Sequence, residues 1–157
     1  MLLDIHKLIK GGIMPVSGEI KVGQKQVIST DKAPAAIGPY SQGTIARFGY
    51  EKLIAVSGQL PLRPEKGGMP DSIQEQTIQA LNNVKAIVEE AGSTMEQVMK
   101  VEIFYTNPDD FKAINAVYKD FFTGDCPARQ AVVVAGLPHP DAKVEISAWV
   151  LAGAKTD

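Results

Sequence analysis

Apolar residues recur along the chain with two different periods, and the change of period separates strands from helices. Alternating or continuous apolar runs predict strands at 26–30, 98–106, 130–136 and 143–152. The segment 44–58 is typical of two strands joined by a Gly-Tyr-Glu-Lys turn. Apolar residues spaced by three and four predict one helix from Ser72 to Gly92 and a second over 107–122.

The first helix carries signals at both of its ends. Ser72 and Glu75 form a capping box, and Gly92 follows the last apolar position. Ser93 and Glu96 repeat the capping pattern and predict a further short turn. The expected buried stripe consists of Ile73, Ile78, Leu81, Val84, Ile87, Val88 and Ala91.

The second helix has Asn107 as its expected N-cap and Pro108 at its first position. Its apolar stripe contains Phe111, Ile114, Tyr118, Phe121 and Phe122. Asn115 falls inside this stripe, where a buried amide needs hydrogen-bond partners. A structural hydrogen bond to a loop and a contact to a ligand explain this position equally well.

The order of elements, β-β-β-α-β-α-β-β, predicts an α+β fold with a mixed sheet and both helices on one face. In the last strand Val144, Ile146 and Ala148 share one face, while Glu145, Ser147 and Trp149 share the other. Because only two helices are available to cover the sheet, its second face needs another partner. We therefore expect the chain to form an oligomer.

Length and composition fit one domain at 27–157 that follows an extension of unknown role at 1–26. The 157 residues include 45% hydrophobic and 22% charged residues, and the net charge of −2 argues against a nucleic-acid partner. A single cysteine, Cys126, favours a reducing compartment, and we expect a cytoplasmic protein without a membrane span.

Common patterns for metals, phosphates and nucleophilic catalysis are absent from the sequence. It has no CxxC or HExxH pattern, and no glycine-rich loop with the spacing of a phosphate-binding loop. His139 lies between two prolines, which argues against a Ser–His–Asp triad, and Cys126 has no evident activating base. We therefore expect no histidine-based metal site.

Polar residues in apolar settings are the remaining candidates for chemistry. Arg129 is a permanent cation at the start of an apolar strand, although a surface arginine at a strand end is the simpler reading of that position alone. A guanidinium binds carboxylates through two hydrogen bonds, and an unpaired carboxylate can hold water. The candidates for a small pocket are Arg129, Glu145, Asn115, Tyr40, Ser57 and Gly58.

Six segments occur in an order that resembles the RidA/YjgF family of enamine/imine deaminases. They are APAAIGPYSQG, AVSGQLPL, ALNNVKAIVEEAG, NAVYKDFF, PARQAVVVAGLP and KVEISA, and the resemblance extends from about Val27 to Ala152. It implies a chorismate-mutase-like fold with a six-stranded mixed sheet and two helices. It also implies a homotrimer with sites between subunits, and hydrolysis of 2-enamine/2-imine acids such as 2-aminoacrylate and 2-iminobutanoate, without a cofactor or metal.

The resemblance also implies roles for individual residues. Arg129 would hold the substrate carboxylate, Glu145 would position the attacking water, and Tyr40 would line the site and assist proton transfer. The pocket would be completed by Ser57, Gly58, Asn115 and the backbone N–H of Ala131. Gln130 and Ser147 depart from the family pattern at positions that are usually small and acidic, respectively.

Two other functions fit parts of the sequence. RNA cleavage with inhibition of translation is also ascribed to this family, and the acidic balance argues against it. A non-catalytic binder of small acids, or a chaperone-like protein, would use the same pocket. The strands that contain Arg129 and Glu145 should not pair as a simple hairpin. That pairing would set Arg129 opposite Trp149 and several residues away from Glu145, with which it is expected to share a site.

Overall fold

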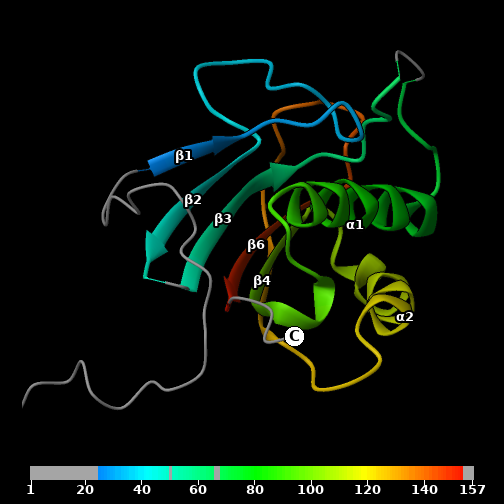
Figure 1. Cartoon of the computed structure of the whole chain (residues 1–157). Coiled ribbons are helices and arrows are strands. Elements are labelled where there is room, and N and C mark those ends of the chain that lie inside the picture. The colour runs from blue at the N-terminus through cyan, green and yellow to red at the C-terminus, as the bar shows by residue number, and fades with distance from the viewer. Residues whose placement is uncertain (1–24, 50, 66–67, 154–157) are drawn as a thin grey trace, which may run out of the picture.

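A six-stranded mixed sheet with two helices makes up the fold of the computed structural model, which describes residues 25–49, 51–65 and 68–153 (Figure 1). The strands lie in the order β1-β2-β3-β6-β4-β5. β4 and β5 run parallel, and the other neighbouring strands of the described sheet run antiparallel. The predicted α+β fold with a six-stranded mixed sheet is confirmed. The strands are β1 (Lys25–Ile28), β2 (Gly43–Phe48), β3 (Glu51–Gln59), β4 (Val98–Tyr105), β5 (Ala128–Val133) and β6 (Val144–Ala152).

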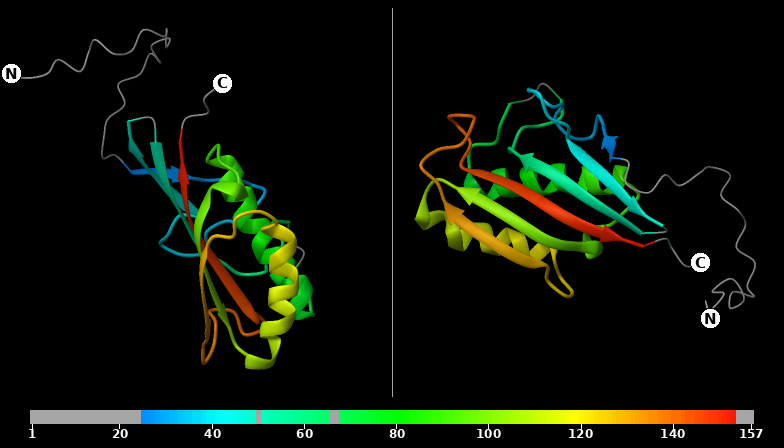
Figure 2. Two further views of the ribbon diagram at one scale, coloured as in Figure 1. Left: turned by 90° about the horizontal axis from the view of Figure 1, so that it is seen from below. Right: turned by 90° about the vertical axis from the view of Figure 1, so that its left-hand side faces the viewer.

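Both helices, α1 (Ile73–Glu90) and α2 (Phe111–Phe121), lie on the same side of the sheet, as Figure 2 shows edge-on. The predicted cap of α1 is confirmed, because the Ser72 hydroxyl accepts a hydrogen bond from the backbone N–H of Glu75 at 3.2 Å. Gly92 follows the helix with φ of 68°, a conformation that glycine adopts without strain. These local signals explain why the sequence located α1 correctly.

Three details of the helical segments differ from expectation. Ile78 is 42% exposed and lies outside the buried stripe, so its assignment to that stripe was wrong. Ser93 does not cap the next turn; the short 3₁₀ turn at Met95–Gln97 begins after Thr94, and the Ser93 hydroxyl donates to Gln97 Oε1 instead. Asn107 does accept from the N–H of Asp109, but it caps a short 3₁₀ turn that precedes α2.

The alternation expected for β6 is confirmed by burial. Val144, Ile146 and Ala148 are buried under the helices, whereas Trp149 on the opposite face is 42% exposed. The right-hand view in Figure 2 shows this second face of the sheet with the helices behind it. We call it the open face, and it includes Leu53, Ala55, Glu145, Ser147, Trp149 and Leu151.

β4 lies between β5 and β6, so the strands of Arg129 and Glu145 are not neighbours. The expectation that they do not form a simple hairpin is confirmed. β5 is an edge strand that pairs in parallel with β4, after the crossover through α2.

The segment expected as an extension, 1–26, lies outside the described residues except for Lys25 and Gln26, which form the first half of β1. Within the described ranges, no helix has the length and apolar character needed to cross a membrane. The same ranges contain no group of three or more His, Cys, Asp or Glu residues that could hold a metal ion.

Candidate active site

A pocket of about 380 Å³ opens where β3 ends and β6 begins. Four of the residues singled out from the sequence line it, namely Tyr40, Ser57, Gly58 and Glu145. Much of the remaining wall is apolar and comes from loops: Pro34, Ala35, Ile37, Leu60, Leu62 and Pro138. The pocket therefore combines a few polar groups with an apolar surface, as is usual for sites that bind small molecules.

An irregularity in β3 positions Ser57 and Gly58. Val56 pairs with Ala148 and Gln59 pairs with Ile146, so β3 contains one residue more than β6 over this interval. The Ser57 hydroxyl donates to the carbonyl of Ser41 at 2.6 Å, which ties β3 to the loop that carries Tyr40. The bulge thus brings two backbone segments to the edge of the pocket.

Glu145 lies directly over Gly58. A Cβ atom built on Gly58 would come within 2.1 Å of Glu145 Oε1, so only glycine leaves room for the carboxylate in this position. The side chain is half-buried, and burial raises the pKa of its carboxyl above the usual range. Among the described residues this carboxylate has no hydrogen-bond or ion-pair partner, so its oxygens can accept hydrogen bonds from a bound water.

Tyr40 sits on a loop that a buried glutamine holds in place. Its hydroxyl accepts a hydrogen bond from the N–H of Ile37 at 3.2 Å, and the side chain is 48% exposed. Gln42, only 5% exposed, accepts from the N–H of Thr30 and donates to the carbonyls of Thr30, Ala33 and Pro34. Gln42 also lines the pocket and was missed at the sequence level, where its position within a loop gave no sign of burial.

Arg129 and Asn115 form a second polar cluster on the helix side of the sheet. Arg129 Nη1 donates to Asn115 Oδ1 at 2.7 Å. The guanidinium carbon lies 4.7 Å from the centroid of the Tyr118 ring and 5.8 Å from that of Phe111, both within the range of cation–π contacts. Two aromatic rings and one amide therefore fix the orientation of the exposed guanidinium.

Tyr118 itself is buried beneath this guanidinium. Burial raises the pKa of Tyr118 to about 12, although the positive charge of Arg129 acts in the opposite direction. The phenol therefore stays neutral over the ordinary pH range. Its hydroxyl has no hydrogen-bond partner among the described residues.

Ala131 belongs to the same strand as Arg129 and lies two residues further along. Val134 donates its N–H to the carbonyl of Tyr105 on β4. Because backbone groups alternate in direction along a strand, the N–H of Ala131 points away from β4, toward the edge of the sheet. This backbone donor is thus available outside the sheet.

A single chain does not bring the Glu145 pocket and the Arg129 cluster together. Arg129 is in register with Val101 and Ala148, whereas Glu145 is in register with Phe104 and Val132. The Cα atoms of Arg129 and Glu145 are therefore about 14 Å apart. Arg129 contacts α2, and Glu145 belongs to the open face, so the two side chains also point to opposite faces of the sheet.

Comparison with known proteins gives close matches over most of the chain. The family model described as endoribonuclease L-PSP matches residues 30–152, which include all six segments quoted above. The 2-iminobutanoate/2-iminopropanoate deaminase of Escherichia coli strain K12 is 44% identical over 126 residues, which cover 78% of this chain and 94% of that protein.

Solved structures agree with this match. The YjgF protein of E. coli has a TM-score of 0.73 at 44% identity, and the alignment covers 80% of this chain and 97% of that one. TdcF of E. coli, solved with bound serine, has a TM-score of 0.75 at 41% identity, with coverage of 82% and 99%.

Proposed function

The chain belongs to the endoribonuclease L-PSP family, which confirms its resemblance to the RidA/YjgF proteins, and on this premise we propose that it deaminates reactive 2-imino acids. The proposed substrates are 2-enamine/2-imine acids such as 2-aminoacrylate and 2-iminobutanoate, and the products are 2-keto acids and ammonia. A relative that is 44% identical is named for this reaction.

The observation that carries the proposal is the Glu145 carboxylate, half-buried and without a partner among the described residues, at the edge of a pocket of about 380 Å³. A carboxylate in this setting can accept a hydrogen bond from water and orient it. The raised pKa makes Glu145 a better proton acceptor than an exposed glutamate. An apolar wall beside it suits the short alkyl group of the substrate.

The reaction needs little more than this water. The carbon of a protonated imine is already electrophilic, so water adds to it while Glu145 accepts one of the water protons. Glu145 then returns this proton to the nitrogen, and the C–N bond breaks as the added hydroxyl forms the C=O bond and gives its own proton to the departing ammonia, which leaves a 2-keto acid behind. Tyr40 and Ser57 would line the site, with the Tyr40 hydroxyl assisting proton transfer, so that the protein contributes mainly orientation.

The substrate carboxylate would be bound by Arg129 of a neighbouring subunit. We propose a homotrimer in which each site lies between two subunits and joins the Glu145 pocket of one to the Arg129 cluster of the next. The separation of the two clusters on opposite faces of one sheet supports this arrangement. The N–H of Ala131 would donate a further hydrogen bond to the substrate.

Asn115 has a different role in this proposal from the one expected from sequence. Its Oδ1 atom accepts the hydrogen bond from Arg129, and the Arg129 guanidinium has further N–H groups for a carboxylate. Asn115 would therefore orient Arg129 rather than contact the substrate.

We place this activity in the cytoplasm. A chain with a single cysteine cannot form a disulfide bond within itself, and this favours a reducing compartment. RNA cleavage, which the family description names, has less support. None of the described residues that line the pocket is a histidine, and the chain has a net charge of −2.

The direct test generates the imine in the cuvette with a pyridoxal-phosphate-dependent dehydratase and follows keto-acid release. We expect wild-type protein to accelerate release and Arg129→Ala to reduce kcat/KM by about a hundredfold, because the substrate carboxylate loses its ion pair. Arg47→Ala, which removes an exposed arginine of β2, is the matched control and should behave as wild type. If wild-type protein gives no acceleration, the proposed function is wrong; if Arg129→Ala retains full activity, the role of Arg129 is wrong.

A further inference from the structure

Helix α1 carries two carboxamide side chains inside the hydrophobic core. Gln76 is 1% exposed and Asn83 is 0% exposed. They are seven residues apart, which places them two turns from each other on the same side of the helix. Burying an amide is unfavourable unless its hydrogen bonds are made, so their partners indicate what these residues are for.

Asn83 holds one wall of the candidate pocket. Its Nδ2 donates to the carbonyl of Leu60 at 3.0 Å and to the carbonyl of Leu62 at 2.9 Å. Its Oδ1 accepts from Gln79 Nε2 at 2.9 Å, which sets the orientation of the amide. Leu60 and Leu62 belong to the irregular segment after β3, and both line the pocket. Both N–H groups of Asn83 are thus used on the backbone of one wall.

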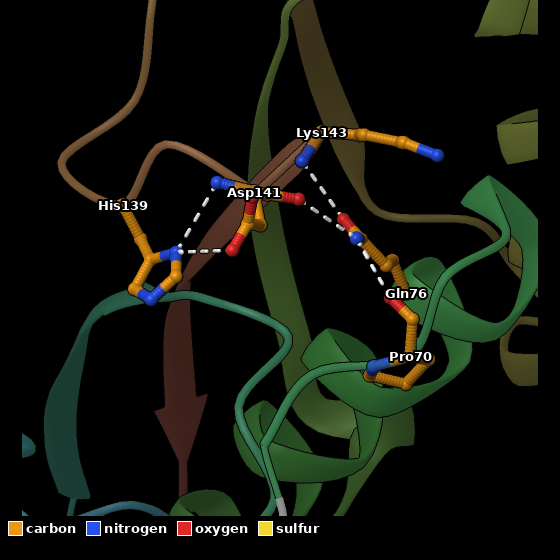
Figure 3. A network of polar contacts seen from close by, with 5 residues as sticks. All are labelled: Pro70, Gln76, His139, Asp141 and Lys143. Atoms are coloured by element: carbon orange, nitrogen blue, oxygen red, sulfur yellow. Dashed lines mark hydrogen bonds and ion pairs between the residues drawn. The ribbon is translucent and has the colours of Figure 1, made fainter.

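Gln76 holds the loop that precedes β6, and Figure 3 shows its hydrogen bonds to this loop and to Pro70. Its Nε2 donates to the carbonyls of Pro70 and Asp141, and its Oε1 accepts from the N–H of Lys143 at 2.8 Å. This loop contains Pro138, which lines the pocket, and leads directly into β6 and Glu145. Gln76 therefore fixes the chain immediately before the proposed water-binding residue.

Both loops depend on these contacts because their partly buried backbone groups lie outside the sheet ladder and have limited access to water, so they need partners elsewhere. An apolar residue at either helix position would fill the core, but it would leave two or three of these backbone groups without their side-chain partner. The segments released would be those that form the apolar wall.

We infer that Gln76 and Asn83 are positioning residues that set the shape of the apolar wall and, through it, the preference for the substrate side chain. This inference rests on the proposed deamination of 2-imino acids. Neither residue contacts the pocket; each acts through the loop that it holds. One methylene in a closely fitting apolar pocket changes kcat/KM by roughly tenfold or more, so a displaced wall should be measurable as altered selectivity.

The test compares kcat/KM for 2-iminobutanoate with kcat/KM for 2-iminopropanoate, both generated in the cuvette. A partly unfolded preparation lowers both values equally, so their ratio reports the shape of the site and not the amount of folded protein. We expect Asn83→Ala and Gln76→Ala each to change this ratio by roughly threefold or more. Thr77→Val is the matched control, because Thr77 is equally buried but its hydroxyl donates to Ile73 within the helix.

Gln79→Ala keeps the test decisive if the two buried variants do not fold. Gln79 is only partly buried, and loss of its side chain frees the Asn83 amide to turn. We therefore expect Gln79→Ala to change the ratio of the two kcat/KM values in the same direction as Asn83→Ala, but by less. An unchanged ratio in the folded variants, or an equal change in Thr77→Val, would overturn the inference. Wild-type protein that hydrolyses neither imine would overturn the proposed function and this inference with it.

Discussion

Glu145 and Gly58 depend on each other at the scale of single residues. The carboxylate occupies the space that a Cβ on residue 58 would fill, with a carboxyl oxygen 2.1 Å from that point. Its position over the bulge of β3 is thus set by the lack of a side chain, whereas its raised pKa is set by burial. Each of these causes can be tested separately.

Gly58→Ala should displace the Glu145 carboxylate and lower kcat/KM by about a hundredfold, because the held water loses its alignment. The free energy of unfolding should change little, since the new methyl group meets the end of a flexible side chain. Gly124→Ala is the control, because a Cβ on Gly124 has nothing within 4 Å. Full activity of Gly58→Ala in the imine assay would contradict the proposed position of the catalytic water.

Glu145→Gln should abolish most activity and yet stabilise the folded protein at neutral pH. Burial raises the pKa of Glu145 in the folded state, so ionising this group opposes folding. That destabilisation is absent below the unfolded-state pKa, about 4.3, and is complete above the raised folded-state value. Urea unfolding should therefore show Glu145→Gln as the more stable protein near pH 7, and the difference should narrow near pH 4. A variant less stable than wild type at both pH values would contradict the cause given for the shift.

At the scale of elements, α1 is specified by signals within its own sequence. Its periodicity and the cap at Ser72 predict a helix without knowledge of the rest of the chain. The hydroxyl of Ser72 both accepts from the N–H of Glu75 and donates to its carboxylate. The stability of this end of the helix therefore depends on one side chain.

Ser72→Ala should lower the free energy of unfolding by about 1 kcal/mol, because a backbone N–H at the start of α1 loses its partner. Chemical denaturation measures this change. Ser72→Thr keeps the hydroxyl and should lose much less. Equal stability of Ser72→Ala and wild type would show that the cap contributes nothing measurable.

The same helix shows where sequence reasoning stops. Periodicity located the core face of α1, but it counted Ile78, which is exposed, and it passed over Gln76 and Asn83, which are buried. An apolar pattern does not register polar residues whose hydrogen bonds are made by distant loops. The insertion of β6 between β3 and β4 is likewise a long-range pairing that no local signal carries. The sequence did argue against a simple hairpin of the last two strands, because that pairing would place Arg129 opposite Trp149 and several residues away from Glu145.

At the scale of the whole molecule, the open face of the sheet leaves large apolar side chains in water. Trp149 and Leu151 are each 42% exposed, and they lie beside Ala55 and Leu53 on β3. An exposed apolar patch on a sheet indicates a contact with another chain. This supports a subunit interface on the open face, where Gln130 and Ser147 also lie.

Trp149→Glu should convert the proposed trimer into monomers, because it would bury a charge in the interface. Light scattering after size-exclusion chromatography measures the mass. Ile78→Glu is a close control, since Ile78 is exposed to the same extent but lies on α1, on the opposite side of the sheet. A trimer that survives Trp149→Glu would show that the subunits meet elsewhere.

The candidate site could be predicted only in part from the sequence, because the proposed site forms between whole subunits. Alternation along β6 gave the face of Glu145, and the helical stripe identified Asn115 as a polar residue that needs a partner. The partner proved to be Arg129, on the helix side of the sheet. Periodicity within one chain cannot indicate which two surfaces meet in an assembly, so the union of the Arg129 and Glu145 clusters remains a prediction.

Mixing two inactive variants tests that union most directly. Arg129→Ala and Glu145→Gln, dissociated together in equal amounts and reassembled, should regain about a quarter of wild-type activity in the imine assay, because one in four interfaces would combine an intact Arg129 with an intact Glu145. Each variant taken alone through the same procedure should stay inactive. If the mixture is no more active than the separate variants while the reassembled trimers do contain both chains, the site is not shared between subunits and the central claim is wrong.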